Sequence, residues 1–120
     1  MTRSAVIARP GARRRKKPVA AAKPRTKELA AIVSDSRMFE FHSPLRVTGR
    51  EEGGIWIHEC KPLRILAYAE SREESWQAFL DYFESDWDGI AQEKDSRLTL
   101  DATEMKREYH KLVKSVRPAP

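Results

Sequence analysis

The chain has 120 residues, which allows one domain, and 40% of them are hydrophobic, enough for one small core. Its single cysteine, Cys60, excludes an intrachain disulfide, and no apolar run approaches the length of about 18 residues needed for a membrane-spanning helix. The formal charge of +5 is unevenly divided: residues 1–37 carry eleven Lys/Arg against two acids, and residues 38–120 carry twelve against sixteen.

The first 37 residues are basic and hold few large apolar side chains. Their densest run is Arg13, Arg14, Arg15, Lys16 and Lys17. Because such a segment cannot offset the entropy lost on ordering, we expect residues 1–37 to be a disordered basic tail and linker. The run is suited to nonspecific nucleic-acid binding through phosphates, and the lack of interleaved aromatic residues argues against base stacking. Two alternatives stay open: a solvated tail without a partner, and translation that begins at Met38.

From residue 39 onward, apolar residues alternate with polar ones, which indicates β-strands. The expected strands cover residues 39–48, 55–60 and 63–69. Pro44 interrupts the first strand or places it at an edge, and Gly53-Gly54 forms the turn before the second. Because the connections are short, the sequence predicts a three-stranded antiparallel meander.

Residues 71–91 carry the clearest helix pattern. Ser71 is a suitable N-cap, and Glu74 completes a capping box. The apolar residues at spacings of three and four are Trp76, Phe79, Leu80, Phe83, Trp87 and Ile90. Burying each of them is worth roughly 1.5–3 kcal/mol, so this helix should cover one face of the meander. The fold class that follows is α+β, with a single domain at residues 38–117.

The C-terminal third gives weaker signals. Residues 96–100 are consistent with a short fourth strand. Asp101 and Glu104 predict the capping box of a second helix. Its expected apolar positions are Met105, Tyr109, Leu112, Val113 and Val116.

The second and third strands suggest where a partner would bind. We expect Ile55 and Ile57 to lie under the helix, because alternation places them on one face. The residues then assigned to the open face are Trp56, His58, Cys60, Leu66 and Tyr68. Exposed aromatic side chains on an uncovered sheet usually mark an interface, so we predict partner binding at Trp56, His58, Leu66 and Tyr68. The equal alternative is that the C-terminal helix folds back and covers this face.

Candidate catalytic groups are few. His58 and Cys60 could both touch one metal ion, but no further ligands follow at zinc-site spacing. The carboxylates of Glu70, Glu73 and Glu74 cluster where a helix N-terminus attracts acids for local reasons. We therefore expect no metal site, no cofactor and no catalytic residue. A small hydrolase that uses these groups is the weakest hypothesis.

Residues 39–91 resemble the core of HicB-type antitoxins. The resemblance lies in three runs, Gly53-Gly54-Ile55-Trp56-Ile57-His58-Glu59-Cys60, Pro62-Leu63 and Ala67-Tyr68-Ala69-Glu70-Ser71-Arg72-Glu73-Glu74-Ser75-Trp76. It implies a degenerate ribonuclease-H-like β-meander crossed by a helix, which pairs with a small RNA-cleaving toxin and blocks it. The chain departs from the family in its basic tail, in its lack of a DNA-binding module after the core, and in a predicted helix where the family has a final strand.

Two functional hypotheses from different classes follow. The first is a non-enzymatic protein-binding module that resembles a HicB-type antitoxin and neutralises a small RNA-cleaving toxin. The alternative is a nucleic-acid-associated protein anchored by its basic tail. A domain of about 80 residues is small, so a partner or a second copy of the chain would stabilise it. The lone cysteine and the absence of a secretory signal favour the cytoplasm, without membrane contact.

Overall fold

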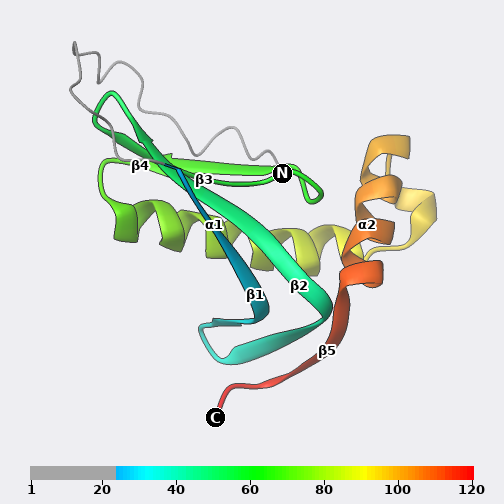
Figure 1. Cartoon of the computed structure of the whole chain (residues 1–120). Coiled ribbons are helices and arrows are strands. Elements are labelled where there is room, and N and C mark those ends of the chain that lie inside the picture. Colours follow the sequence, from blue (N-terminus) through cyan, green and yellow to red (C-terminus); the bar gives the residue numbers. More distant parts are fainter. Residues whose placement is uncertain (1–23) are drawn as a thin grey trace.

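The structure is a computed structural model that describes residues 24–120 (Figure 1). The first of its two helices lies on one face of a five-stranded antiparallel sheet, and the second lies at one end of that sheet. The expected α+β class is therefore confirmed. The strands are β1 (Arg25–Ser34), β2 (Arg37–Glu52), β3 (Ile55–Cys60), β4 (Ile65–Ala69) and β5 (Val113–Pro118). The helices are α1 (Arg72–Asp86), continued by a π-helical turn at Trp87–Ala91, and α2 (Leu100–Leu112).

The long strand β2 is the centre of the sheet. One of its edges pairs with β1, from Arg25 opposite Gly49 to Ser34 opposite Arg37. Its other edge is shared, because β5 pairs with its first part and β3 with its last part. The strand order is β1-β2-β3-β4, so β4 is an edge strand of the described sheet. Figure 1 shows β2 running diagonally across α1, with β5 beside its lower end.

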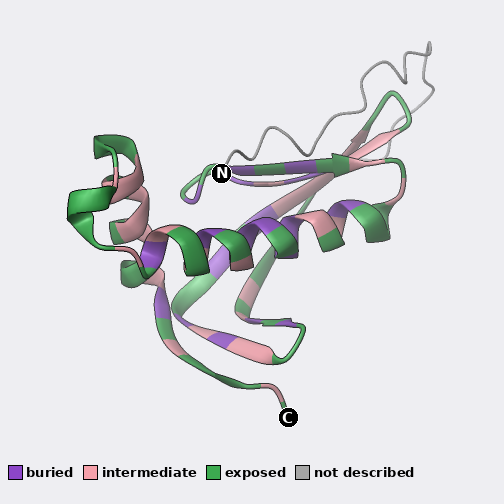
Figure 2. Cartoon of the chain, turned by 180° about the vertical axis from the view of Figure 1, so that it is seen from behind, coloured by how far each residue is buried: buried purple, intermediate pink, exposed green. Residues whose placement is uncertain are grey.

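Helix α1 begins where the sequence predicts. The Ser71 side chain accepts a hydrogen bond from the backbone N–H of Glu74 at 3.1 Å, which satisfies one of the free donors of the first turn. The apolar stripe of the helix then faces the sheet, as the buried positions in Figure 2 show. Phe79 and Phe83 are fully buried there, and the rings of Phe83 and Phe39 meet edge to face with centroids 5.0 Å apart. The core therefore lies between α1 and one face of the sheet.

Polar contacts tie the far end of α1 to the β1–β2 hairpin. Arg37 donates hydrogen bonds to Glu84 at 2.8 Å and to Asp88 at 3.0 Å, and Ser34 donates to Glu84 at 2.9 Å. Because two carboxylates stabilise its charged form, the pKa of Arg37 is raised above its ordinary value. These bonds fix the angle at which the helix crosses the hairpin.

Four expectations about element boundaries are wrong. Residues 25–37, assigned to a linker, form β1 and the start of β2, so the domain begins earlier than residue 38. Residues 96–100 form a 3₁₀ turn and a helix start instead of a strand. Thr99, and not Asp101, caps α2 by accepting from the N–H of Ala102. The helix ends at Leu112, and Val113 to Pro118 form β5.

Within residues 24–120, no helix has the length and hydropathy required to cross a bilayer.

Candidate functional site

The four residues predicted to bind a partner lie on two different faces of the sheet. In an antiparallel pair, residues directly opposite each other share a face. Trp56 lies opposite Ala69 and His58 opposite Ala67, whereas Tyr68 lies opposite Ile57. The prediction that Trp56, His58 and Cys60 point away from the helix, and that Ile55 and Ile57 lie under it, is therefore wrong. Of the four predicted binding residues, only Leu66 and Tyr68 lie on the open face.

His58 and Cys60 are buried beneath α1. His58 is 4% exposed and Cys60 is fully buried. The Nδ1 atom of His58 lies 2.7 Å from the hydroxyl of Ser75, which itself donates to the carbonyl of Ala67 at 3.1 Å. Because the Ser75 hydroxyl reaches the Ala67 carbonyl, small side chains at these two positions let the helix approach the sheet closely.

The open face keeps an apolar strip on β3 and β4. Leu66 is 37% exposed and Tyr68 is 38% exposed, and Ile57 lies between them and β2. Helix α2 packs against the end of α1 through Tyr109, which contacts Phe83 with ring centroids 5.3 Å apart. The alternative in which the C-terminal helix covers Leu66 and Tyr68 is therefore also wrong.

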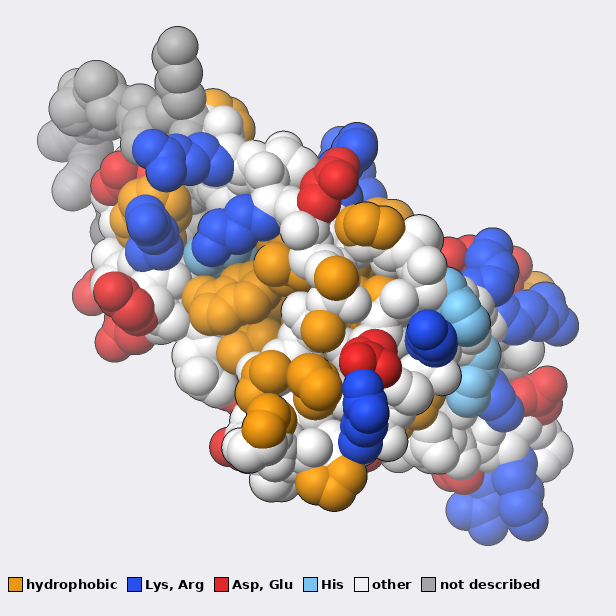
Figure 3. Space-filling model, turned by 60° about the horizontal axis from the view of Figure 1, so that its bottom comes forward, with side chains coloured by type: hydrophobic (Ala, Val, Ile, Leu, Met, Phe, Trp, Pro, Cys, Tyr) orange, Lys and Arg blue, Asp and Glu red, His pale blue; other side chains and the backbone are white. Residues whose placement is uncertain are grey.

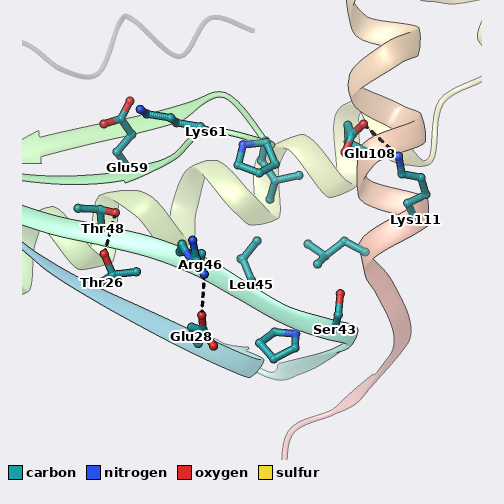
Figure 4. Close-up of a pocket in the computed structure, with 14 residues that line it drawn as sticks. Thr26, Glu28, Ser43, Leu45, Arg46, Thr48, Glu59, Lys61, Glu108 and Lys111 are labelled. Atoms are coloured by element: carbon teal, nitrogen blue, oxygen red, sulfur yellow. Dashed lines mark hydrogen bonds and ion pairs between the residues drawn. The ribbon is translucent and has the colours of Figure 1, made fainter.

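A groove of about 740 Å³ runs from the open face to the foot of α2 (Figure 4). Its walls carry charges of both signs. Arg46 bonds to Glu28 at 3.0 Å, and Lys111 lies 3.5 Å from Glu108. A surface on which paired opposite charges flank apolar side chains is better suited to bind a polypeptide than a polyanion.

The covered face has a second hollow, where α1 leaves the β1–β2 end of the sheet open. This hollow is named the cationic pocket, and its lining residues are Arg25, Lys27, Val47, Gly49, Trp56, His58 and Arg72. Its volume is about 220 Å³. Figure 3 shows Lys and Arg side chains gathered around a histidine and hydrophobic side chains at one end of the molecule. Sequence patterns did not predict this pocket, because its cations come from the expected tail and linker and from the first turn of α1.

The hydrogen bonds of His58 fix its tautomer. Since the hydroxyl of Ser75 donates its proton to Ala67, it accepts one from Nδ1–H of His58. Nε2 then carries the lone pair, and it lies on the side of Gly49, where an added Cβ would come within 3.2 Å of it. Burial, together with the charges of Lys27 and Arg72, lowers the pKa of His58 to about 4. The imidazole is thus neutral at pH 7.

This lowered pKa predicts a loss of stability in mild acid. Between pH 6.5 and 4 the unfolded chain binds a proton at His58 and the folded chain does not, so unfolding becomes more favourable as the pH falls. We expect roughly 3 kcal/mol less free energy of unfolding at pH 4 than at pH 7 from this group. Urea denaturation of the parent and of His58→Gln measures it. Equal pH dependence in the two proteins would contradict the assignment.

The structure also places the remaining candidates for chemistry. Burial raises the pKa of the Cys60 thiol, which disfavours the reactive thiolate. Glu70, Glu73 and Glu74 are exposed around the first turn of α1. Among residues 24–120, no group of three or more His, Cys, Asp or Glu side chains is placed to hold a metal ion. The basic run from Arg13 to Lys17 lies outside the described residues.

Comparison with known proteins adds no relative. No family model, curated protein or solved structure matches this chain.

Proposed function

We propose that this protein is a non-enzymatic protein-binding module, similar to a HicB-type antitoxin, which neutralises a small RNA-cleaving toxin. The observation that carries the proposal is the uncovered apolar strip of Leu66 and Tyr68 on the open face. Large apolar side chains that share one exposed patch are typical of protein interfaces. Tyrosine in particular contributes strongly to binding energy at such sites.

The edge strand β4 gives the same surface a second means of binding. Its outer backbone groups are unpaired within the described sheet, and Leu66 and Tyr68 project beside them. An extended segment of a partner can add to such an edge through main-chain hydrogen bonds, while side-chain contacts give specificity. The partner would then cover the strip and the edge together.

The local geometry supports the resemblance to the HicB-type core. Gly53 and Gly54 adopt φ angles of 57° and 84°, so this turn uses the conformational freedom that glycine supplies. Ser71 caps α1, and β5 is a strand that follows the helices and pairs with β2. The glycine turn and the Ser71 cap belong to the residues that carry the resemblance.

The test is co-expression with the product of a small reading frame beside the gene, assayed by rescue of growth and by pull-down. We expect rescue and a stable complex with the parent chain. The double variant Leu66→Lys/Tyr68→Lys should weaken binding at least about 100-fold, because two lysines in a desolvated interface cost several kcal/mol. Its own stability should change little.

The matched control is Val33→Lys, which places a lysine on an exposed apolar residue of β1. It should bind as the parent does. Full binding by the double variant, or no complex with any neighbouring product, would contradict the proposal.

A second candidate function is association with nucleic acid through the N-terminal segment. Residues 24–120 carry fifteen Lys/Arg against eighteen acids, so the positive excess of the whole chain comes from residues 1–23. Five phosphates neutralised by Arg13 to Lys17 would make binding to a single strand fall on the order of 100-fold between 50 and 200 mM salt.

Deleting residues 1–23 tests this candidate, because the deletion removes basic charge and none of the described strands or helices. We expect the salt-dependent binding to vanish, as measured by fluorescence anisotropy with a labelled oligonucleotide. Unchanged binding by the shortened chain would exclude the tail as the site.

A further inference from the structure

The cationic pocket contains a buried polar atom that has no partner in the described part of the chain. His58 is 4% exposed, its Nδ1 is bonded to Ser75, and its Nε2 has no hydrogen-bond partner among residues 24–120. A buried acceptor without a hydrogen bond costs free energy, and such groups in folded proteins usually bind water or a ligand. Gly49 keeps the approach to this atom open, since a Cβ there would lie 3.2 Å from it.

The pocket also gathers three cations that form no ion pair within residues 24–120. Arg25, Lys27 and Arg72 form no salt bridge with any carboxylate of the described range, although that range holds more acids than bases. They come from two elements, β1 and α1, that enclose the same hollow. Three unpaired cations around one opening favour an anionic ligand.

Two of the residues that line the pocket carry planar groups. The guanidinium of Arg72 lies 5.5 Å from the ring centroid of Trp56, and both residues line the hollow. Aromatic rings and arginine planes are the surfaces on which nucleobases stack. The volume of about 220 Å³ is smaller than sites for whole drug-sized ligands, so one planar group enters and the rest of the ligand stays at the rim.

We propose that the cationic pocket binds a nucleotide. The base stacks in the hollow beside Trp56 and Arg72 and donates an amino or imino N–H to Nε2 of His58. The phosphate lies at the rim, where Lys27 and Arg25 contact it. This site lies on the face opposite Leu66 and Tyr68, so it is separate from the toxin-binding surface and does not depend on it.

The state of His58 agrees with this role. The charged groups around it are Arg25 and Lys27 of β1 and Arg72 of α1. Its other neighbours are neutral: Ser75 and Trp76 of α1, Gly49 of β2 and Ala67 of β4. The lowered pKa keeps Nε2 unprotonated at pH 7, and only an unprotonated nitrogen accepts a hydrogen bond from a base.

The nucleotide could be free or part of a single strand, because both present a base and a phosphate. Arg25, the first residue of β1, lines this pocket, and the basic residues 1–23 precede it in the sequence. A strand could therefore contact both the pocket and that segment, whereas a free nucleotide needs the pocket alone.

The experiment is an NMR titration of the full-length, ¹⁵N-labelled chain at pH 7. The ligands are AMP, adenosine, inorganic phosphate and an oligoadenylate of eight nucleotides. We expect AMP to shift the indole N–H signal of Trp56 and the amide signal of Gly49. Adenosine and phosphate should each bind at least about tenfold more weakly, because each makes only part of the contacts. If the oligoadenylate shifts the same signals at lower concentrations than AMP does, the ligand is a strand. If AMP alone shifts them, it is a free nucleotide.

Three variants of pocket residues and one control variant test which side chains bind the nucleotide. Lys27→Ala and Arg72→Ala should each weaken AMP binding about tenfold, and Lys94→Ala, an exposed lysine on the loop before α2, should leave it unchanged. Gly49→Ala should block the base and leave weak phosphate binding. The proposal is overturned if AMP shifts no pocket signal, if phosphate binds as tightly as AMP, or if Lys27→Ala and Arg72→Ala bind as the parent does.

Discussion

A chain that starts at Met38 should fail to fold at 25 °C. Removing residues 1–37 deletes β1, which pairs with β2 along most of its length. It also removes Ile32, 2% exposed in the core, and Leu29, which packs against it. Each such side chain contributes roughly 1.5–3 kcal/mol, and Leu45 and Val47 of β2 would become exposed as well. The sum approaches the whole stability of a small domain, about 5–15 kcal/mol.

The matched control is deletion of residues 1–23, which leaves every described strand and helix in place. Far-UV circular dichroism and thermal unfolding compare the two chains. We expect a cooperative transition only in the longer one. A cooperative transition in the chain that starts at Met38 would show that β1 is dispensable, and it would revive the prediction of a linker at residues 25–37.

Phe83→Ala should cost about 3–5 kcal/mol of the free energy of unfolding. Phe83 is fully buried, and its ring contacts Phe39 and Phe41 of β2 and Tyr109 of α2, with centroids 5.0, 5.9 and 5.3 Å away. Truncation leaves a cavity where three elements meet and removes favourable edge-to-face contacts. No other side chain of α1 joins the sheet to the second helix through so many rings.

Two companion variants separate the cavity from other effects. Phe83→Leu keeps most of the volume and should cost roughly half as much. Asp81→Ala changes an exposed residue of the same helix and should stay within about 0.5 kcal/mol of the parent. Urea unfolding gives all three values. A cost for Phe83→Ala as small as that for Asp81→Ala would mean that the aromatic cluster does not hold the fold together.

Local patterns predicted the elements whose signals are local. Ser71 and Glu74 located the start of α1, because capping depends on atoms three residues apart. The turn at Gly53-Gly54 and the end at Cys60 bounded β3 as the structure has it. The stripe through Phe79 and Phe83 correctly placed the covered side of α1.

Patterns could not predict what depends on distant partners. Alternation in β3 separates Ile57 from His58, but it does not say which of them faces the helix. The close contact of α1 through Ser75 requires small residues opposite it, and Ala67 meets that need. Likewise, Val113 and Val116 are compatible with a helix by spacing, and only their pairing with β2 makes them a strand.

The predicted site was divided for the same reason. Tyr68 lies on the open face, whereas Trp56 lines the cationic pocket. The cations of that pocket come from β1 and α1, more than forty residues apart in the sequence. No spacing rule joins such residues, so the pocket emerges only once β1 pairs with β2.

Thiol labelling tests the two-faced sheet most directly, because the chain has one cysteine and it lies on the covered face. Ellman's reagent should react with Cys60 only after unfolding, since that thiol is fully buried and its pKa is raised. In the Leu66→Cys variant, one thiol per folded chain should react at once, because residue 66 lies on the open face. A folded chain in which Cys60 reacts at the denatured rate, or in which the new thiol at residue 66 is protected, would contradict this arrangement.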